Sequence, residues 1–403
     1  MRRLGRYRRK RQNRIILITA FSLLFVITAG YAAFSTNITF HAKGNIIEGP
    51  RVIQAWDENS QTDFHSDYYK QNIVSATFVD NNNVPDNAVE RWNVSEDKTN
   101  GEVIAWVVPS VSESSKYDLY IGAKAGVIAN ENSGYVFYNF KSLKEINFDD
   151  NYDTSNAEDM TQMFRCCGSL ESIDLSTLDT SNVTNMNDLF NMWDSSAGIW
   201  ISNKLSKITF GSNFDTSNVT TMRNMFAGLA ELKKIDVSNF NTSNVTDMYH
   251  MFWSCQNLTE LDVSNFDTSK VTDMEGMFCM WISGENNVSN LTELDVSLFD
   301  TRNVTSMRDM FAYNTNLVEI KGLETFDTSR VTNMYHMFTH CEKLKALNLC
   351  SFDTRNVNNM KAMMSETFNL KKLYVGPNWT TENADITHMF YNSSVSSVTT
   401  GQC

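Results

Sequence analysis

The stretch FNTSNVTDMYHMFWSCQNLTELDVSN (240–265) decides the fold, because close copies of its first half recur along most of the chain. The second position of each copy falls at residues 153, 179, 215, 241, 267, 300, 327, 353 and 379. The base spacing is 26 residues, with insertions of ten, seven and one. Self-similarity at a fixed period is the signature of a repeat protein, in which each unit buries its apolar side against the next.

Each unit is expected to contain two elements. In VTDMYHMF (245–252) the apolar residues recur at i, i+3, i+6 and i+7, which predicts a short helix, and the preceding polar residues would cap it. Leu258, Leu261 and Val263 give an L-x-x-L-x-V pattern that predicts a short strand. The predicted fold class is α/β: a leucine-rich-repeat solenoid of about nine 26-residue strand–helix units.

The phrases FDTSNVTxMxxMF and LTELDVSNFDTS resemble those of bacterial BspA-like leucine-rich-repeat surface proteins. The resemblance covers about 150–390 closely, and the upstream segments 92–107 and 117–148 resemble the entry segment of that family. It implies a surface-exposed or secreted bacterial protein that attaches to host matrix proteins or to other cells. It does not imply a particular ligand.

The N-terminus predicts a membrane segment. Residues 1–14 carry eight Arg or Lys and form a basic cytoplasmic tail, and 15–35 are long and apolar enough to span a bilayer. This segment is either a signal anchor or a cleaved signal peptide, with Gly30 and Ala32 as small residues near a cleavage site. The chain that follows is therefore expected outside the cell.

Three further regions follow the apolar segment. Residues 36–63 predict a polar spacer, and 64–150 contain strand-like runs that predict a β-rich N-terminal cap for the stack. An independent small β domain is the alternative for this region. Residues 151–403 contain the repeats, and the divergent last copy is typical of a C-terminal cap.

The net charge and the motif content of the chain argue against several classes of function. The net charge is −13, and without the basic tail the remaining residues sum to −21, which argues against nucleic-acid binding. We find no phosphate loop, no CxxC pair and none of the common hydrolase motifs. A non-catalytic binding protein is expected; an envelope-associated enzyme or processing factor with its site in 64–150, or a structural surface protein, are the alternatives.

Aromatic residues at one edge of the repeats are the candidate binding residues. The insertions at 191–204 and 279–290 enter at the same point of the unit, so both should protrude from the same edge. Aromatic side chains there are common anchors for protein or glycan partners, although the first Trp of each insertion could instead pack inward. The candidates are Trp193, Trp200, Trp253 and Trp281, with Tyr249 and Tyr335 as a second patch.

A row of carboxylates is the candidate metal site. Asp174, Asp236, Asp262 and Asp295 alternate with the apolar residues of the predicted strands and should point outward from neighbouring units. Like charges this close should raise a pKa or recruit a cation, and Ca²⁺ is the candidate, since it binds clustered oxygen ligands. A basic partner on this acidic face is the alternative, and no other cofactor is expected.

Overall fold

The computed structural model describes residues 51–98, 102–281, 288–395 and 397–400, all within one compact unit. Helices in these ranges are short: the 3₁₀ turns η2 (Asp63–His65) and η3 (Leu323–Thr325) and the four-residue α2 (Asp67–Lys70). None of them could cross a bilayer. The predicted tail at 1–14, the predicted apolar span at 15–35 and most of the predicted spacer lie outside the described residues.

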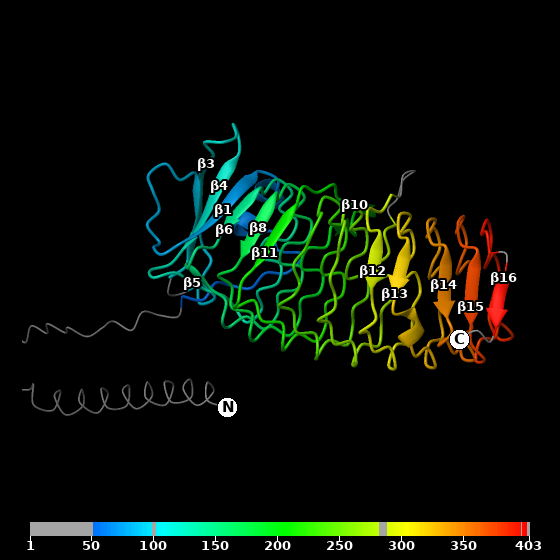
Figure 1. Cartoon of the computed structure of the whole chain (residues 1–403). Coiled ribbons are helices and arrows are strands. Elements are labelled where there is room, and N and C mark those ends of the chain that lie inside the picture. Colours follow the sequence, from blue (N-terminus) through cyan, green and yellow to red (C-terminus); the bar gives the residue numbers. More distant parts are fainter. Residues whose placement is uncertain (1–50, 99–101, 282–287, 396, 401–403) are drawn as a thin grey trace, which may run out of the picture. The chain divides into compact units, whose positions relative to one another are not determined.

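A five-stranded sheet lies at the N-terminal end of this unit (Figure 1). Its strand order is β2-β3-β4-β1-β6, and β1 pairs in parallel with both β4 and β6. The strands are β1 (Ile73–Val79), β2 (Glu90–Asn93), β3 (Ile104–Pro109), β4 (Tyr117–Gly122) and β6 (Glu145–Asn147).

This sheet is continuous with the repeats. The amide of Glu171 in the first repeat donates to the carbonyl of Lys144, next to β6, at 3.3 Å. The short strands β5 (Val127–Ile128) and β7 (Tyr152–Asp153) pair in parallel across the same junction. A single cluster of buried apolar residues extends from Ile53 to Met389, so the sheet covers the first layer of the stack.

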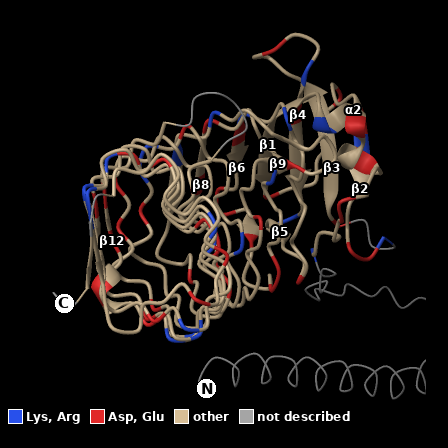
Figure 2. Cartoon of the chain, turned by 90° about the vertical axis from the view of Figure 1, so that its right-hand side faces the viewer, with Lys and Arg blue, Asp and Glu red and all other residues tan. Residues whose placement is uncertain are grey.

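Successive repeats stack in register. One residue of each repeat forms a parallel bridge with its counterpart in the next, and Figure 2, viewed from the C-terminal end, shows the turns overlaid. Val219, Val245 and Val271, one repeat apart, are all fully buried in the common core. The bridged residues are Asn132, Asp159, Asn185, Thr221, Asp247, Asp273, Ser306, Asn333, Asn359 and Asp385.

Short parallel strands form a second side of the stack, and inward and outward residues alternate along them. In β8, Ile173 and Leu175 are buried and Ser172 and Asp174 are exposed. Where no strand is assigned, as at 232–237 and 258–263, the same apolar positions still point into the core, apart from the half-buried Ile235. The paired strands are β8 (Ser172–Leu175) with β11 (Lys207–Phe210), β12 (Glu293–Asp295) with β13 (Glu319–Lys321), and β14 (Ala346–Leu349) with β15 (Lys372–Val375) and β16 (Ser397–Thr400).

The predicted strand–helix units, and with them the α/β class and the leucine-rich-repeat solenoid of such units, are wrong. The segment 245–252 is a run of tight turns: the amides of Met248, His250 and Phe252 donate to Asp273, Glu275 and Met277 of the next repeat at 2.9–3.1 Å. His250 has a φ of 55°, which no α-helix contains.

The physical reason lies in the backbone hydrogen bonds. An eight-residue helix leaves four amides and four carbonyls without partners inside the helix, and buried backbone groups without partners are costly. In these turns every second amide, such as those of His250 and Phe252, bonds to the next repeat, while the amide of Met251 between them bonds to the carbonyl three residues earlier. The apolar spacing i, i+3, i+6, i+7 is correct as a core pattern, since Val245, Met248, Met251 and Phe252 are fully buried, but a ladder of turns produces the same spacing.

Candidate functional site

The ten-residue insertion folds into a β-hairpin beside the run of turns. The two-residue strands β9 (Trp193–Asp194) and β10 (Ile199–Trp200) pair antiparallel, with Trp193 opposite Trp200. The Asp194 carboxylate accepts from the backbone amides of Ser196 and Ala197, which closes the turn. The two indole rings meet edge to face, with centroids 5.2 Å apart.

Charged side chains of earlier repeats anchor this hairpin. The guanidinium of Arg165, itself 8% exposed, donates to the carbonyl of Trp193 at 2.7 Å. Lys141 pairs with Asp194 at 3.0 Å. Burial by itself would raise the pKa of Asp194, but hydrogen bonds from Ser196 and Lys141 lower it to about 2. The hairpin is therefore held at a fixed position on the edge of the stack.

Two glycines make room for tryptophans of the same edge. A Cβ on Gly228 would lie 2.6 Å from the ring of Trp200, and a Cβ on Gly276 would lie 2.6 Å from the ring of Trp253. Both glycines have positive φ, at 82° and 57°. Each indole ring therefore rests on the backbone of a following repeat.

A column of stacked planar groups continues from Trp253. The ring of His250 lies 4.0 Å from that of Trp253 and 3.6 Å from that of Tyr249. The Arg223 guanidinium, one repeat earlier, covers Tyr249 at 3.5 Å from the ring centroid. Arg223 also contacts Asp247 at 3.4 Å. Planar cations and rings that stack in this way fix each other's orientation.

The hairpin and the column enclose a pocket of about 350 Å³. It is lined by five of the six predicted binding residues, together with Asn191, Arg223, Asn224 and His250. Its size is within the range of small-ligand sites in proteins. The five predicted residues are Trp193, Trp200, Trp253, Trp281 and Tyr249, and all five are half-buried rather than packed fully inward.

Tyr335, the sixth predicted residue, lies outside this pocket. It stacks on His336 at 3.6 Å and lies under Arg308 at 5.2 Å, so it repeats the Arg–Tyr–His arrangement of the pocket column. No Trp follows at the corresponding position, where Thr339 is buried instead. The predicted second patch is thus divided: Tyr249 belongs to the pocket and Tyr335 does not.

Burial and charge keep the His250 ring neutral. Burial, with a smaller effect from the Arg223 and Arg308 guanidinium groups, lowers the pKa of His250 to about 3. A neutral imidazole can stack between two rings without bringing a buried positive charge next to two guanidinium groups. The inner surface of the pocket is consequently aromatic and uncharged, apart from the Arg223 guanidinium.

Several pocket residues were not predicted from the sequence. Arg223 could have been found, because an Arg stands about one repeat before each Tyr-His pair, as Arg308 does before Tyr335. Gly228 and Gly276 carried a weaker signal, since each replaces a larger residue at its repeat position. Asn203 and Gln256, which line an adjoining hollow, follow no repeat pattern that distinguishes them.

The predicted aspartate row lies on a different surface. Asp236, Asp262 and Asp295 line a groove of about 780 Å³ with Glu260 and Glu293, flanked by Lys234 and Lys321, on the side of the stack that holds β12 and β13. Asp174 is not among the residues that line the groove. Two of the acids pair with the lysines: Glu260 with Lys234 at 2.6 Å and Glu293 with Lys321 at 3.3 Å.

The carboxylates of this row act locally in turns. Each accepts the backbone amide of the serine two residues later, from Asp174 with Ser176 to Asp295 with Ser297, at 2.9–3.0 Å. Hydrogen bonds from these serines lower the pKa of Asp236, Asp262 and Asp295, whereas we expected mutual repulsion to raise it. Among the described residues no group of three or more His, Cys, Asp or Glu is arranged to hold a metal ion.

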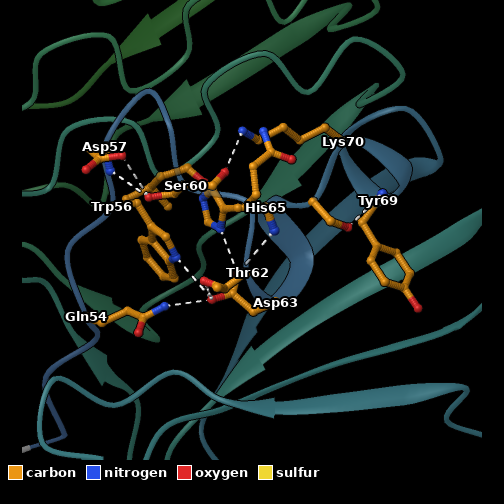
Figure 3. Close-up of polar contacts among 12 residues, drawn as sticks. Gln54, Trp56, Asp57, Ser60, Thr62, Asp63, His65, Tyr69 and Lys70 are labelled. Atoms are coloured by element: carbon orange, nitrogen blue, oxygen red, sulfur yellow. Dashed lines mark hydrogen bonds and ion pairs between the residues drawn. The ribbon is translucent and has the colours of Figure 1, made fainter.

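The cap region contains a buried polar network, shown in Figure 3. The ring of His65, fully buried, contacts the Asp63 carboxylate at 2.9 Å through Nδ1 and the Val136 carbonyl at 3.0 Å through Nε2. Asp63 also accepts from Gln54 at 2.7 Å and from Trp56 at 3.3 Å. Both ring nitrogens are occupied and no solvent reaches them, so this histidine holds segments of the cap region together and is not placed to receive a substrate.

A comparison with known protein families identifies one family whose model matches this chain. The family model described as "Mycoplasma protein of unknown function, DUF285" matches residues 131–196, 196–292 and 280–401. The matches cover more than half of the chain, and every residue of the aromatic pocket lies within them. No curated protein matches the chain.

Proposed function

The chain belongs to the DUF285 family, and from that premise we propose that it is a non-catalytic, BspA-like surface protein that attaches its cell to a host protein, a matrix component or a neighbouring cell. The aromatic pocket is the attachment site. The observation that carries this proposal is the convergence of four tryptophans and a tyrosine, from one hairpin and two further repeats, on a single pocket.

Three properties support a binding role for the pocket. Tryptophan and tyrosine provide large contact areas at low conformational entropy, and they dominate the binding energy of many interfaces. The rings are positioned before any partner arrives, by Arg165, Gly228 and Gly276, so little ordering is lost on binding. The surrounding stack provides an extended surface for further contacts.

Export follows from the N-terminal sequence. The basic tail 1–14 and the apolar segment 15–35 would direct the repeats outside the cell and either retain them on the membrane or release them after cleavage. Membrane contact is then limited to 15–35. The acidic body, which sums to −21 in charge, is not suited to nucleic acid.

The proposal is tested by incubating the purified full chain, reconstituted in lipid vesicles, with cultured host cells and with immobilised matrix proteins, and measuring bound protein. We expect binding that falls about tenfold or more in the double variant Trp200→Ala/Trp281→Ala. Trp379→Ala removes a half-buried tryptophan of the last repeat and is the matched control. Binding that the double variant retains in full, while its melting curve shows that it is folded, would contradict the proposal.

A further inference from the structure

A second hollow adjoins the aromatic pocket on the other side of Trp200. It has a volume of about 240 Å³, and Trp200, Asn203, Gly228, Ser254 and Gln256 line it. Trp200 lines both spaces, so the two are neighbours on the surface of the stack.

Three residues that line this hollow each carry a buried polar atom with no hydrogen-bond partner within the described part of the chain. These atoms are the indole Nε1 of Trp200, the Oδ1 of Asn203 and the Nε2 of Gln256. Asn203 is 6% exposed and Gln256 is 8% exposed. The Nδ2 of Asn203 donates to the carbonyl of Gly228 at 2.6 Å, which fixes the side chain with its Oδ1 unpaired. Buried polar atoms without partners are costly, and they concentrate where a ligand supplies the missing partner.

The chemistry of these atoms restricts the ligand. Trp200 and Gln256 offer N–H donors and Asn203 offers an acceptor, so the ligand must present two acceptors and one donor close together. Two adjacent hydroxyl groups do so, because each hydroxyl both donates and accepts. A phosphate or a carboxylate presents acceptors only, which would leave Asn203 unpaired, and Glu231 in the lining would repel it.

The aromatic pocket restricts the same ligand further. The Nε1 of Trp253 is also buried and unpaired there, which adds one more donor. The half-buried indole rings of Trp193 and Trp281 complement an apolar face. The Arg223 guanidinium is covered on one face by Tyr249 and contacts Asp247 at 3.4 Å, so part of its charge is already balanced within the chain. A neutral ligand with an apolar face and a hydroxylated edge fits these conditions.

We propose that the aromatic pocket and the adjoining hollow bind a neutral glycan, with the C–H face of one sugar ring on the tryptophans and two adjacent hydroxyls in the hollow. This inference rests on the proposed function, and it identifies the part of the partner that the pocket binds as a neutral glycan. Trp193 and Trp200 contact the ring, while Gln256 and Asn203 contact the hydroxyls.

The test is an array of neutral, sialylated and sulfated glycans probed with the full chain and four variants. Trp193→Ala removes the ring contact, and Gln256→Met removes the buried amide with little change in volume. The matched controls are Trp379→Ala in the last repeat and Gln71→Met, an exposed residue of the cap. We expect binding to neutral glycans that both pocket variants weaken by about tenfold or more and both controls retain.

Three results would overturn the inference: the full chain binds no neutral glycan, it binds only sialylated or sulfated ones, or Gln256→Met binds as the full chain does. Periodate treatment of the target cells, under conditions that oxidise the rings of neutral sugars, separates this inference from the proposed function, because periodate cleaves the carbon–carbon bond between two carbons that carry adjacent hydroxyls. If periodate-treated cells still bind the full chain but not Trp200→Ala/Trp281→Ala, attachment through the pocket stands and the glycan inference fails.

Discussion

Thr216 and Asn241 share two hydrogen bonds across the boundary between neighbouring repeats. The hydroxyl of Thr216 donates to the carbonyl of Asn241 at 3.0 Å and accepts the amide of the same residue at 2.8 Å. Thr216 is fully buried. In the described part of the chain, the equivalent threonine of seven other repeats also donates to a carbonyl of the next repeat. Four of these, such as Thr301 with Asp327, also accept an amide of that repeat. The threonine of the D-T-S-N phrase therefore joins layers, rather than capping a helix.

The first prediction concerns this contact. Thr216→Val keeps the shape of the side chain but leaves the amide and carbonyl of Asn241 buried without partners, so it should lower the free energy of unfolding by about 1–3 kcal/mol. Urea unfolding of the full chain measures the change. The control is Thr220→Val, whose hydroxyl also bonds to a neighbouring repeat but is exposed, and it should change stability by less than about 0.5 kcal/mol. Equal effects of the two variants would refute the assigned role.

The second prediction concerns the backbone beneath Trp253. Gly276→Ala would place a Cβ 2.4 Å from His250 and 2.6 Å from Trp253, so it should displace the indole ring and destabilise the chain by about 1–3 kcal/mol. Gly198→Ala is the control, because its φ of 66° is similar and nothing lies within 4 Å of the added carbon. The melting temperature and the tryptophan fluorescence should change more in Gly276→Ala than in Gly198→Ala. Equal changes in the two variants would mean that the Trp253 ring does not rest on the backbone at Gly276.

The third prediction concerns pH. The pKa of His250 is lowered from 6.5 to about 3 in the folded chain, chiefly by burial. Between these values the unfolded chain binds more protons than the folded chain, so the free energy of unfolding should fall as the pH is lowered below about 6.5. His250→Asn, which tolerates the positive φ, should remove part of this slope.

Urea unfolding at several pH values between about 4 and 7 measures that slope. His388→Asn is the control, because His388 occupies the same repeat position with a φ of 60° but is exposed in the last repeat. The prediction fails if His250→Asn loses stability on acidification as steeply as the unmodified chain does.

The fourth prediction concerns the cysteines. Cys167, Cys255 and Cys341 occupy one repeat position, are fully buried, and each donates its S–H to a carbonyl of the preceding repeat at 3.0–3.2 Å. Burial raises the pKa of Cys255 and Cys341 to about 12. Because the thiolate is the reactive form, none of the three should react with iodoacetamide in the folded chain, and all should react in urea. Mass spectrometry of the labelled peptides measures the reaction of each cysteine. Labelling of any of the three in the folded chain would contradict the prediction.

The core and the stacking could be predicted from the sequence, whereas the local backbone could not. Val245, Met248, Met251 and Phe252 are buried as their spacing indicated. The spacing of apolar residues does not show which carbonyl each backbone amide bonds to. In a helix every amide would bond within its own unit, whereas here the amides of Met248, His250 and Phe252 bond to the next unit. The residue type at position 250 was a local signal against a helix. Most repeats have Asn, Asp, His or Gly there, and these residues are the ones that most readily adopt the positive φ found in turns.

The candidate site was predictable in its aromatic residues and not in its polar ones. Trp193 and Trp281 stand out because each begins an insertion at a repeat boundary, and both line the pocket. Asn203 and Gln256 become significant only through the burial of particular atoms, which depends on how the hairpin folds back on Gly228. The aspartate row differs again: its regular spacing placed Asp236, Asp262 and Asp295 along one groove, but it did not show that each carboxylate accepts an amide of its own turn.

The most direct test of the central claim, that the aromatic pocket is the attachment site, is hydroxyl-radical footprinting of the full chain, free and bound to intact host cells. Oxidation of Trp193, Trp200, Trp253 and Trp281 should decrease on binding, while Trp379 in the last repeat should be oxidised equally in both states. Unchanged oxidation of the four pocket tryptophans on cells that have bound the protein would contradict the account.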